Sequence, residues 1–300
     1  MDLDRRVLIA GGAVAVTAAV TASAVAAVGR AGAAAVIAPA APTLPRRIVS
    51  LNPCLDVILV QLVDHERIAA LSHYSREAYG STIAPVARTL PFTWGTAEEI
   101  IARAPDLVIT GRFSAATGRA LDRLGVHTAV FDVPETVEAS LAQVREVARL
   151  VGAPERGEAM VARIEAALTE AAPKPGTPRL STLVFMPGGF ASGPGTLMDE
   201  MMTRMGLDNA ATKYGLRQSM SVPLEQVIAD PPDLLLSGEV SPGAPSRALR
   251  VMSHPALRHL AGHMSHATFP ERLLFCGGPV LIQTAQALAR ARETALRGRG

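Results

Sequence analysis

Short apolar runs alternate with stretches of helical periodicity along the chain. The runs at 46–53, 68–74 and 106–111 predict buried strands, and 121–133 predicts a helix, a glycine stop and a fourth strand. Apolar residues within 54–63, between the first two runs, recur at helical spacing. Strands that alternate with helices predict βαβ units, whose parallel strands are joined by right-handed crossovers. The first part of the chain is therefore expected to form an α/β lobe.

Two fourteen-residue stretches of the sequence are closely similar. EEIIARAPDLVITG begins at Glu98 and EQVIADPPDLLLSG begins at Glu225, and seven of the fourteen positions are identical. Each stretch predicts a short amphipathic helix, a Pro-Asp break, a buried strand and a glycine turn. Because the copies lie far apart, they predict two similar lobes and not a solenoid of tandem repeats.

A long helix is predicted between the two copies. Residues 155–172 have apolar positions along one face, and Pro154 stands at a favourable first helical position. Strands at 179–189 and 233–238 and a closing helix at 280–296 predict a second α/β lobe. The expected fold is α/β, with two Rossmann-like lobes joined by a single long inter-lobe helix and a ligand cleft between the lobes.

The N-terminal segment has the pattern of an export signal. Arg5 and Arg6 precede an uncharged stretch, 7–29, which is rich in Ala and Gly and typical of a twin-arginine signal. An uncleaved membrane anchor is the alternative, since this stretch is long enough to span a bilayer. We assign 1–35 to the export signal, 36–45 to a Pro/Ala linker, 46–152 to the N-terminal lobe, 153–174 to the inter-lobe helix and 175–300 to the C-terminal lobe.

Composition and motifs favour binding over catalysis. A net charge of +2 over 300 residues gives no sign of the basic surface that binds nucleic acid. Two cysteines are too few for a disulfide-dense scaffold. The sequence has no G-x-S-x-G elbow, H-E-x-x-H helix, C-x-x-C pair or Walker loop. We therefore expect no enzyme, and a cleft hydrolase built on unfamiliar residues is the alternative from another class.

The order and spacing of seven segments resemble the helical-backbone (class III) periplasmic substrate-binding proteins of ABC importers. The segments are RRIVSLNP, ALSHYS, TWGTAEEIIARAPDLVITG, LGVHTAVFDV, PLEQVIADPPDLLLSG, SHPALRHLAG and CGGPVLIQTAQAL. The resemblance implies a monomeric periplasmic receptor without a cofactor of its own. Such a receptor captures a ferric siderophore, cobalamin or haem and delivers it to an ABC permease dimer in the inner membrane.

The resemblance also gives a role to the repeat. In this family one surface glutamate per lobe docks onto arginines of the permease dimer, and the matching positions are Glu98 and Glu225. A permease with two-fold symmetry needs two equivalent acidic contacts. The alternative is that both glutamates are ordinary solvated surface residues.

Candidate ligand contacts follow the predicted strands, because strand carboxyl ends converge on the binding crevice of an open α/β sheet. These positions are Asn52, Tyr74, Ser75, Arg76, Arg112, Phe113, Phe190, Glu239 and Phe269. Trp94, the only tryptophan, stands where the family often has an aromatic residue, and Phe92 lies beside it. Aromatic walls suit a flat chelate, although Trp94 and Tyr74 could instead close the base of the cleft.

Positive charge decides the expected order of ligands. Arg76, Arg112 and Arg217 suit an anionic chelate, which places a ferric siderophore first. Stacking around Trp94 would suit a corrin, so cobalamin and then haem are the alternatives. In each case the ligand is an iron or cobalt chelate.

Cys54 and Cys276 each stand at the start of a predicted helix, one in each lobe. We expect two buried free cysteines, which behave as small hydrophobic residues, with a reactive thiol as the alternative. A disulfide is not expected, because a bridge across the cleft would block its opening.

Four histidines stand close together at His254, His259, His263 and His266. On a helix His259 and His263 would share one face, as a zinc site requires. No acidic ligand stands nearby, so we expect surface histidines, and direct zinc capture is the alternative.

Overall fold

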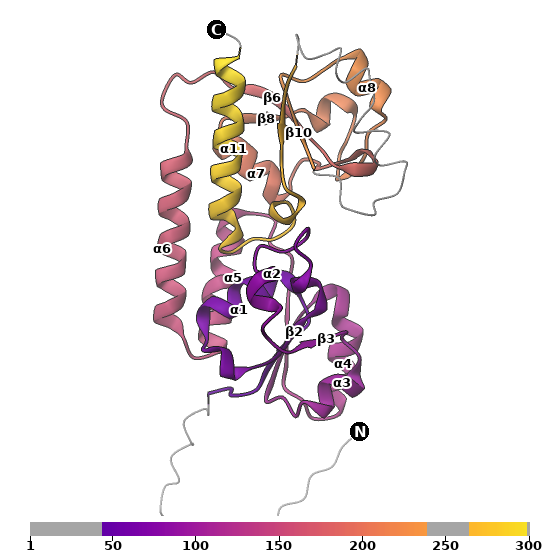
Figure 1. Ribbon diagram of the computed structural model, residues 1–300, viewed down its shortest axis with the longest axis vertical. Helices are drawn as coiled ribbons and strands as arrows, with labels where there is room; N and C mark the ends of the chain where they lie inside the picture. Colours follow the sequence, from indigo (N-terminus) through magenta and orange to yellow (C-terminus); the bar gives the residue numbers. More distant parts are fainter. Residues whose placement is uncertain (1–43, 239–263, 299–300) are drawn as a thin grey trace, which may run out of the picture. The chain divides into compact units, whose positions relative to one another are not determined.

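A computed structural model describes residues 44–238 and 264–298 (Figure 1). The predicted export signal, Glu239, His254, His259 and His263 lie outside these ranges. In the described part of the chain, no helix is both long enough and apolar enough to cross a membrane.

The first lobe is built on a five-stranded parallel sheet. Its strand order is β3 (Phe92–Thr93), β2 (Ile68–Ser72), β1 (Ile48–Ser50), β4 (Leu107–Gly111) and β5 (Thr128–Phe131). Its helices are α1 (Pro53–Leu62), α2 (Ala84–Ala87), α3 (Ala97–Ala102), α4 (Ala115–Arg123) and α5 (Val137–Leu150). The predicted alternation of strands and helices is confirmed, and the short edge strand β3 is an addition to it.

The second lobe is built on a mixed sheet. Its order is β11 (Ser265–Thr268), β10 (Leu234–Ser237), β6 (Leu180–Phe185), β7 (Phe190–Ala191) and β9 (Met220–Ser221), and β8 (Leu207–Asn209) also pairs with β6. Strands β8, β10 and β11 belong to the parallel part, whereas β7 and β9 pair antiparallel. Among the described residues, the helices of this lobe are α7 (Leu197–Arg204), α8 (Leu224–Ala229) and α11 (Val280–Arg297).

One long helix, α6 (Pro154–Ala171), connects the two lobes as predicted (Figure 1). Pro154 occupies the first helical turn, where the missing N–H of proline leaves no hydrogen bond unmade. Helix α6 packs against both α5 and α11.

A single apolar core joins the inner faces of both sheets. Ile48 and Ile109 from the first sheet share it with Val184 and Leu236 from the second, and Ile164 of α6 lies among them, each at most 1% exposed. The opposite faces have cores of their own, one with Val108 and Leu121 and the other with Leu183 and Leu235. Burial on both faces is the requirement of a parallel sheet.

The repeated Pro-Asp step has the same structural role in both lobes. Asp106 accepts hydrogen bonds from the backbone N–H groups of Arg46 (2.6 Å) and Arg47 (2.9 Å), and Asp233 accepts one from that of Ser181 (2.8 Å). Arg47 and Ser181 hold equivalent places, because Ile48 pairs with Leu107 and Thr182 with Leu234. Each aspartate therefore fixes the start of the neighbouring strand.

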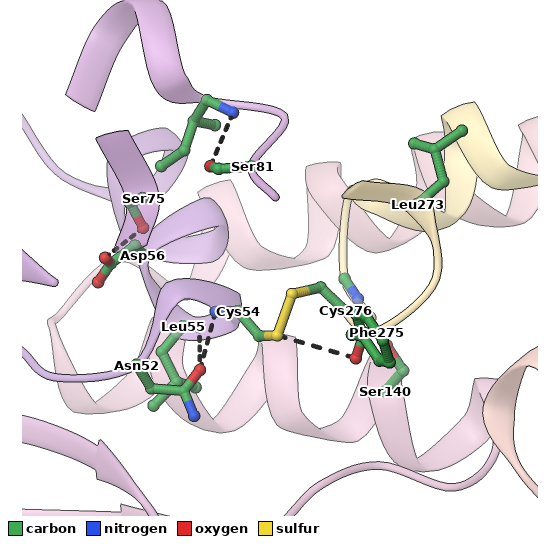
Figure 2. Close-up of a disulfide and its surroundings, with 12 residues drawn as sticks. Asn52, Cys54, Leu55, Asp56, Ser75, Ser81, Ser140, Leu273, Phe275 and Cys276 are labelled. Carbon is green, nitrogen blue, oxygen red and sulfur yellow. Dashed lines mark hydrogen bonds between the residues drawn. A yellow bond between two sulfur atoms is a disulfide. The ribbon is translucent and has the colours of Figure 1, made fainter. Parts of the chain in front are cut away.

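The expectation of free cysteines is wrong, because Cys54 and Cys276 form a disulfide (Figure 2). Their Cα atoms lie 5.0 Å apart, within the usual range for a bridge. Cys54 lies in the first turn of α1, and Cys276 lies in the loop before α11. The objection that a bridge would block opening assumed that the lobes separate here, whereas the shared core already joins them.

We expect Asp106→Ala and Asp233→Ala each to lower the free energy of unfolding by about 1–3 kcal/mol, because backbone donors lose a charged acceptor. Denaturant titration measures the change. Asp122→Ala is the matched control, since Asp122 is an exposed residue of α4, and its effect should stay within about 0.5 kcal/mol. Equal effects of all three substitutions would contradict the role given to the repeat.

Candidate functional site

A pocket of ≈ 490 Å³ lies where the strands of the first sheet end. Asn52 follows β1, Gly111 ends β4 and Asp132 follows β5, and all three line it. Phe275 and Gly277 line it from the loop before α11. The volume lies in the range of small-molecule sites, and the position matches the crevice expected for an open α/β sheet.

Aromatic side chains form much of the pocket wall. Tyr74, Phe113, Phe131 and Phe275 all line it. Tyr74 is 60% exposed, Phe113 92% and Phe275 56%, although large aromatic side chains are usually buried. Exposed aromatic surface gathered around one pocket is characteristic of a binding site.

A second hollow of ≈ 570 Å³ adjoins the first. Phe113, Asp132 and Val133 line both, and Arg112 and Glu135 line only the second. Phe113 therefore borders both spaces.

Two charged groups of the site, Arg112 and Asp132, are paired with each other. Arg112 forms a bidentate ion pair with Asp132, in which its Nη2 lies 2.8 Å from Oδ2 and its Nε also donates to Oδ1. These hydrogen bonds hold the pKa of Asp132 below its usual range and raise that of Arg112. Gln143 donates to the Asp132 carbonyl oxygen (2.7 Å) and fixes the end of β5.

Asn52 has a structural task at the pocket floor. Its Oδ1 accepts hydrogen bonds from the backbone N–H groups of Cys54 (2.8 Å) and Leu55 (3.3 Å), and so caps helix α1 (Figure 2). Its side chain also lies against Gly111, where an added Cβ would come within 2.4 Å of Nδ2. This position of β4 therefore requires glycine.

A buried carboxyl group supports the turn that carries Tyr74. Asp56 on α1 is fully buried, and its Oδ2 accepts a hydrogen bond from the Ser72 N–H (2.9 Å). It also accepts one from the Ser75 hydroxyl (2.6 Å), shown in Figure 2. Ser75 belongs to the 3-10 helix η2 (His73–Arg76), which follows β2. Burial raises the pKa of Asp56 to about 7, against hydrogen bonds that lower it.

The predicted residues Arg76, Phe92 and Trp94 form a cluster beside the pocket, outside its lining. The His73 ring lies 3.9 Å from that of Tyr74 and 4.4 Å from that of Trp94, which is 64% exposed. The Arg76 guanidinium lies 4.1 Å from the centre of the Phe92 ring. The cluster connects Trp94 to the pocket through His73 and Tyr74.

The structure contradicts two predicted contacts. Ser75 is fully buried, and its hydroxyl donates to Asp56. Phe269 is the other. Its side chain is 1% exposed and packs in the shared core, so it cannot touch a ligand. Its position after β11 suggested the crevice, but apolar burial determined its orientation. Phe190 is half-buried, with its ring 6.2 Å from that of Phe275. Arg217 is exposed and lies outside the pocket lining.

Sequence reasoning missed Phe275, Asp132 and Gln143. Phe275 follows no strand, and only the bridge at Cys276 indicates its place. Asp132 lay inside the predicted run 121–133, whereas the strand ends at Phe131, so the rule that selected Arg112 passed over its partner.

The two glutamates of the repeat are both exposed. Glu98 lies in the first turn of α3, and Glu225 lies in the first turn of α8. The neighbouring Glu99 differs, because it accepts hydrogen bonds from the Thr93 hydroxyl (2.6 Å) and the Trp94 N–H (2.8 Å), which lower its pKa.

Of the four histidines, only His266 lies in the described ranges. It stands on β11, and its Nε2 shares a hydrogen bond with the Ser237 hydroxyl. Within those ranges, no group of three or more His, Cys, Asp and Glu residues is arranged to hold a metal ion.

Comparison with known proteins identifies relatives of this fold. A sequence profile of the periplasmic binding protein family matches residues 48–262. A search of curated proteins found no match.

Three solved structures illustrate the similarity, which at these identities concerns the fold. The apo periplasmic haem-binding protein RhuT of Roseiflexus sp. RS-1 is 24% identical, with a TM-score of 0.65 over 85% of this chain and 99% of that one. The vitamin B12-binding protein BtuF of Vibrio cholerae is 16% identical, with a TM-score of 0.65 over 85% and 100%. Helicobacter pylori CeuE in its Ni-His complex is 16% identical, with a TM-score of 0.66 over 85% and 86%.

The raised pKa of Asp56 predicts a pH-dependent stability. Between its ordinary pKa of 3.8 and about 7, the unfolded chain ionises this carboxyl whereas the folded protein keeps it protonated. The contribution of Asp56 to the free energy of unfolding is therefore fully present below pH 3.8 and is lost as the pH rises to about 7. Above that pH the free energy of unfolding no longer changes through this group. The loss is on the order of 4 kcal/mol, at 1.36 kcal/mol per pH unit.

Asp56→Asn removes this titration while keeping the side-chain shape. The difference in unfolding free energy between wild type and variant, measured by urea titration at several pH values, should change across this window and be constant above pH 7. A difference that does not depend on pH would contradict the assignment.

Proposed function

The chain belongs to the periplasmic binding protein family, and on that premise we propose that it captures a metal chelate for an ABC importer. One observation carries the choice of ligand surface. The pocket lining includes three aromatic side chains that are left exposed to solvent, Tyr74, Phe113 and Phe275. A flat ligand with large apolar faces would bury them.

Geometry favours a metal macrocycle over a hydrophilic ferric siderophore. The siderophore expectation relied on three arginines, but Arg112 is paired with Asp132, Arg76 lies on the Phe92 ring and Arg217 is outside the lining. In the described part of the chain no unpaired arginine lines the pocket. Haem or a corrin needs apolar walls more than positive charge, so we place these ligands before a siderophore.

We propose that Tyr74 faces the metal of the bound chelate. It is the tyrosine in the pocket lining, and its turn is held from below by Asp56. A tyrosine oxygen is an established ligand of haem iron. The relatives RhuT and BtuF bind haem and vitamin B12 respectively, which supports this class of ligand.

Delivery to a permease is assigned to Glu98 and Glu225. Both are exposed, both lie in the first turn of a short helix and each belongs to a different lobe. Single exposed ion pairs contribute only about 0–1 kcal/mol, but two at a fixed separation orient one partner on the other and raise the rate of association. A disulfide also suits an exported protein, since bridges persist in oxidising compartments.

Tryptophan fluorescence tests the ligand assignment, because Trp94 is the only tryptophan and contacts the pocket through His73 and Tyr74. We expect saturable quenching by haemin or cobalamin. Tyr74→Phe and Phe113→Ala should each weaken binding about tenfold or more, whereas Tyr214→Phe in the second lobe should not. Quenching by a ferric siderophore alone would overturn the preference for a macrocycle.

Charge reversal tests the docking assignment. Glu98→Arg combined with Glu225→Arg should lower chelate uptake by whole cells at least about tenfold and leave chelate affinity unchanged. The control pair is Glu146→Arg with Glu170→Arg, two exposed glutamates on α5 and α6, and it should leave uptake normal. Equal loss in both pairs, or lost affinity, would contradict docking through the repeat.

A further inference from the structure

The pocket receives one wall from a loop of the second lobe. Residues 275–278 lie between the 3-10 helix η7 (Glu271–Leu273) and α11, and Phe275 and Gly277 reach the pocket. The Phe275 side chain remains 56% exposed, so its place is not set by burial. Something else must hold this loop against the first lobe.

The disulfide is the first of two attachments. It joins Cys276, the residue after Phe275, to Cys54, which itself lines the pocket in the first turn of α1 (Figure 2). Phe275 is therefore tethered to helix α1 through its neighbour Cys276.

A hydrogen bond to α5 is the second attachment. The Gly278 N–H donates to the hydroxyl of Ser140 (2.7 Å), which is fully buried. A Cβ on Gly277 would lie 2.4 Å from that Oγ, and one on Gly278 would lie 2.9 Å from Ile58 on α1. Gly278 also has a positive φ of 59°. The two glycines let the loop approach both helices closely, and the fit allows no larger residue.

We propose that Phe275 is a selective wall of the ligand site and that the Cys54–Cys276 bridge positions it, so that ligand affinity depends on the redox state of the bridge. This inference rests on the proposed function for its ligand. With the bridge intact, the loop is held and Phe275 stands over the pocket. With the bridge broken, the buried Leu274 and the Gly278 hydrogen bond still hold the ends of the loop, but Phe275 between them loses its tether and leaves the wall.

Reduction requires a dithiol as co-reactant. Its thiolate attacks one sulfur of the bridge, and the other cysteine leaves as a thiolate that takes up a proton. The second thiol of the reagent then displaces the remaining cysteine from the mixed disulfide. The protein gains two thiols and the dithiol becomes a disulfide, so two electrons and two protons pass to the protein.

The experiment compares oxidised and dithiol-reduced wild-type protein, reduced while folded so that no refolding is needed. Haemin affinity and amide hydrogen exchange at Gly278 are both measured. We expect reduction to weaken haemin binding about tenfold or more and to remove the protection of the Gly278 amide. Near-UV circular dichroism checks that the folded state persists.

Three variants separate the bridge from the wall. Phe275→Ala should weaken haemin binding with the bridge intact and make the remaining affinity insensitive to reductant. Cys54→Ser with Cys276→Ser should match the reduced protein in both conditions. Gly277→Ala should displace the loop without breaking the bridge and should give an intermediate affinity.

Unchanged haemin affinity and unchanged Gly278 protection after reduction would overturn the proposal. If haemin binds neither form, the proposed ligand fails. Hydrogen exchange at the Gly278 amide then tests by itself whether the bridge positions the loop. Loss of protection on reduction supports that role, and retained protection overturns it.

Discussion

One continuous apolar core, shared by the inner faces of both sheets, is the constraint on which the rest of the structure depends. Ile48 and Ile109 reach it from the first sheet, Leu236 reaches it from the second, and α6 packs against both α5 and α11. Because a parallel sheet must be buried on both faces, helices cover the faces and leave the strand ends free. Wide separation of the lobes would expose this core. We therefore infer a site that is largely formed before the ligand arrives.

The repeat combines a structural task with a functional one. Its aspartates, Asp106 and Asp233, fix equivalent strand starts through backbone hydrogen bonds. Its glutamates, Glu98 and Glu225, make no comparable contribution to the fold and remain exposed. The aspartate therefore fixes an equivalent pair of parallel strands in each lobe, and the short helix before that pair presents the glutamate. Each of the two similar lobes therefore presents one exposed glutamate at an equivalent position.

Much of the fold was readable from the sequence, because its signals are local. Helix α6, with Pro154 in its first turn, and the strands β4 and β10 follow from periodicity and turn residues. The two-residue strands β3, β7 and β9 were missed, since their pairing is set by distant partners. The site was predicted less well for the same reason. Phe269 follows a strand but turns into the core, whereas Phe275 reaches the pocket through a bridge between cysteines 222 residues apart.

The central claim is that a metal chelate sits between Tyr74, Phe113 and Phe275. X-ray diffraction from crystals of the haemin-loaded oxidised protein, recorded at the iron absorption edge, tests it most directly. An anomalous difference map locates the metal without assumptions about the ligand. We expect one strong peak in the pocket, beside the Tyr74 hydroxyl. A peak elsewhere, with the pocket empty of ligand density, would contradict it.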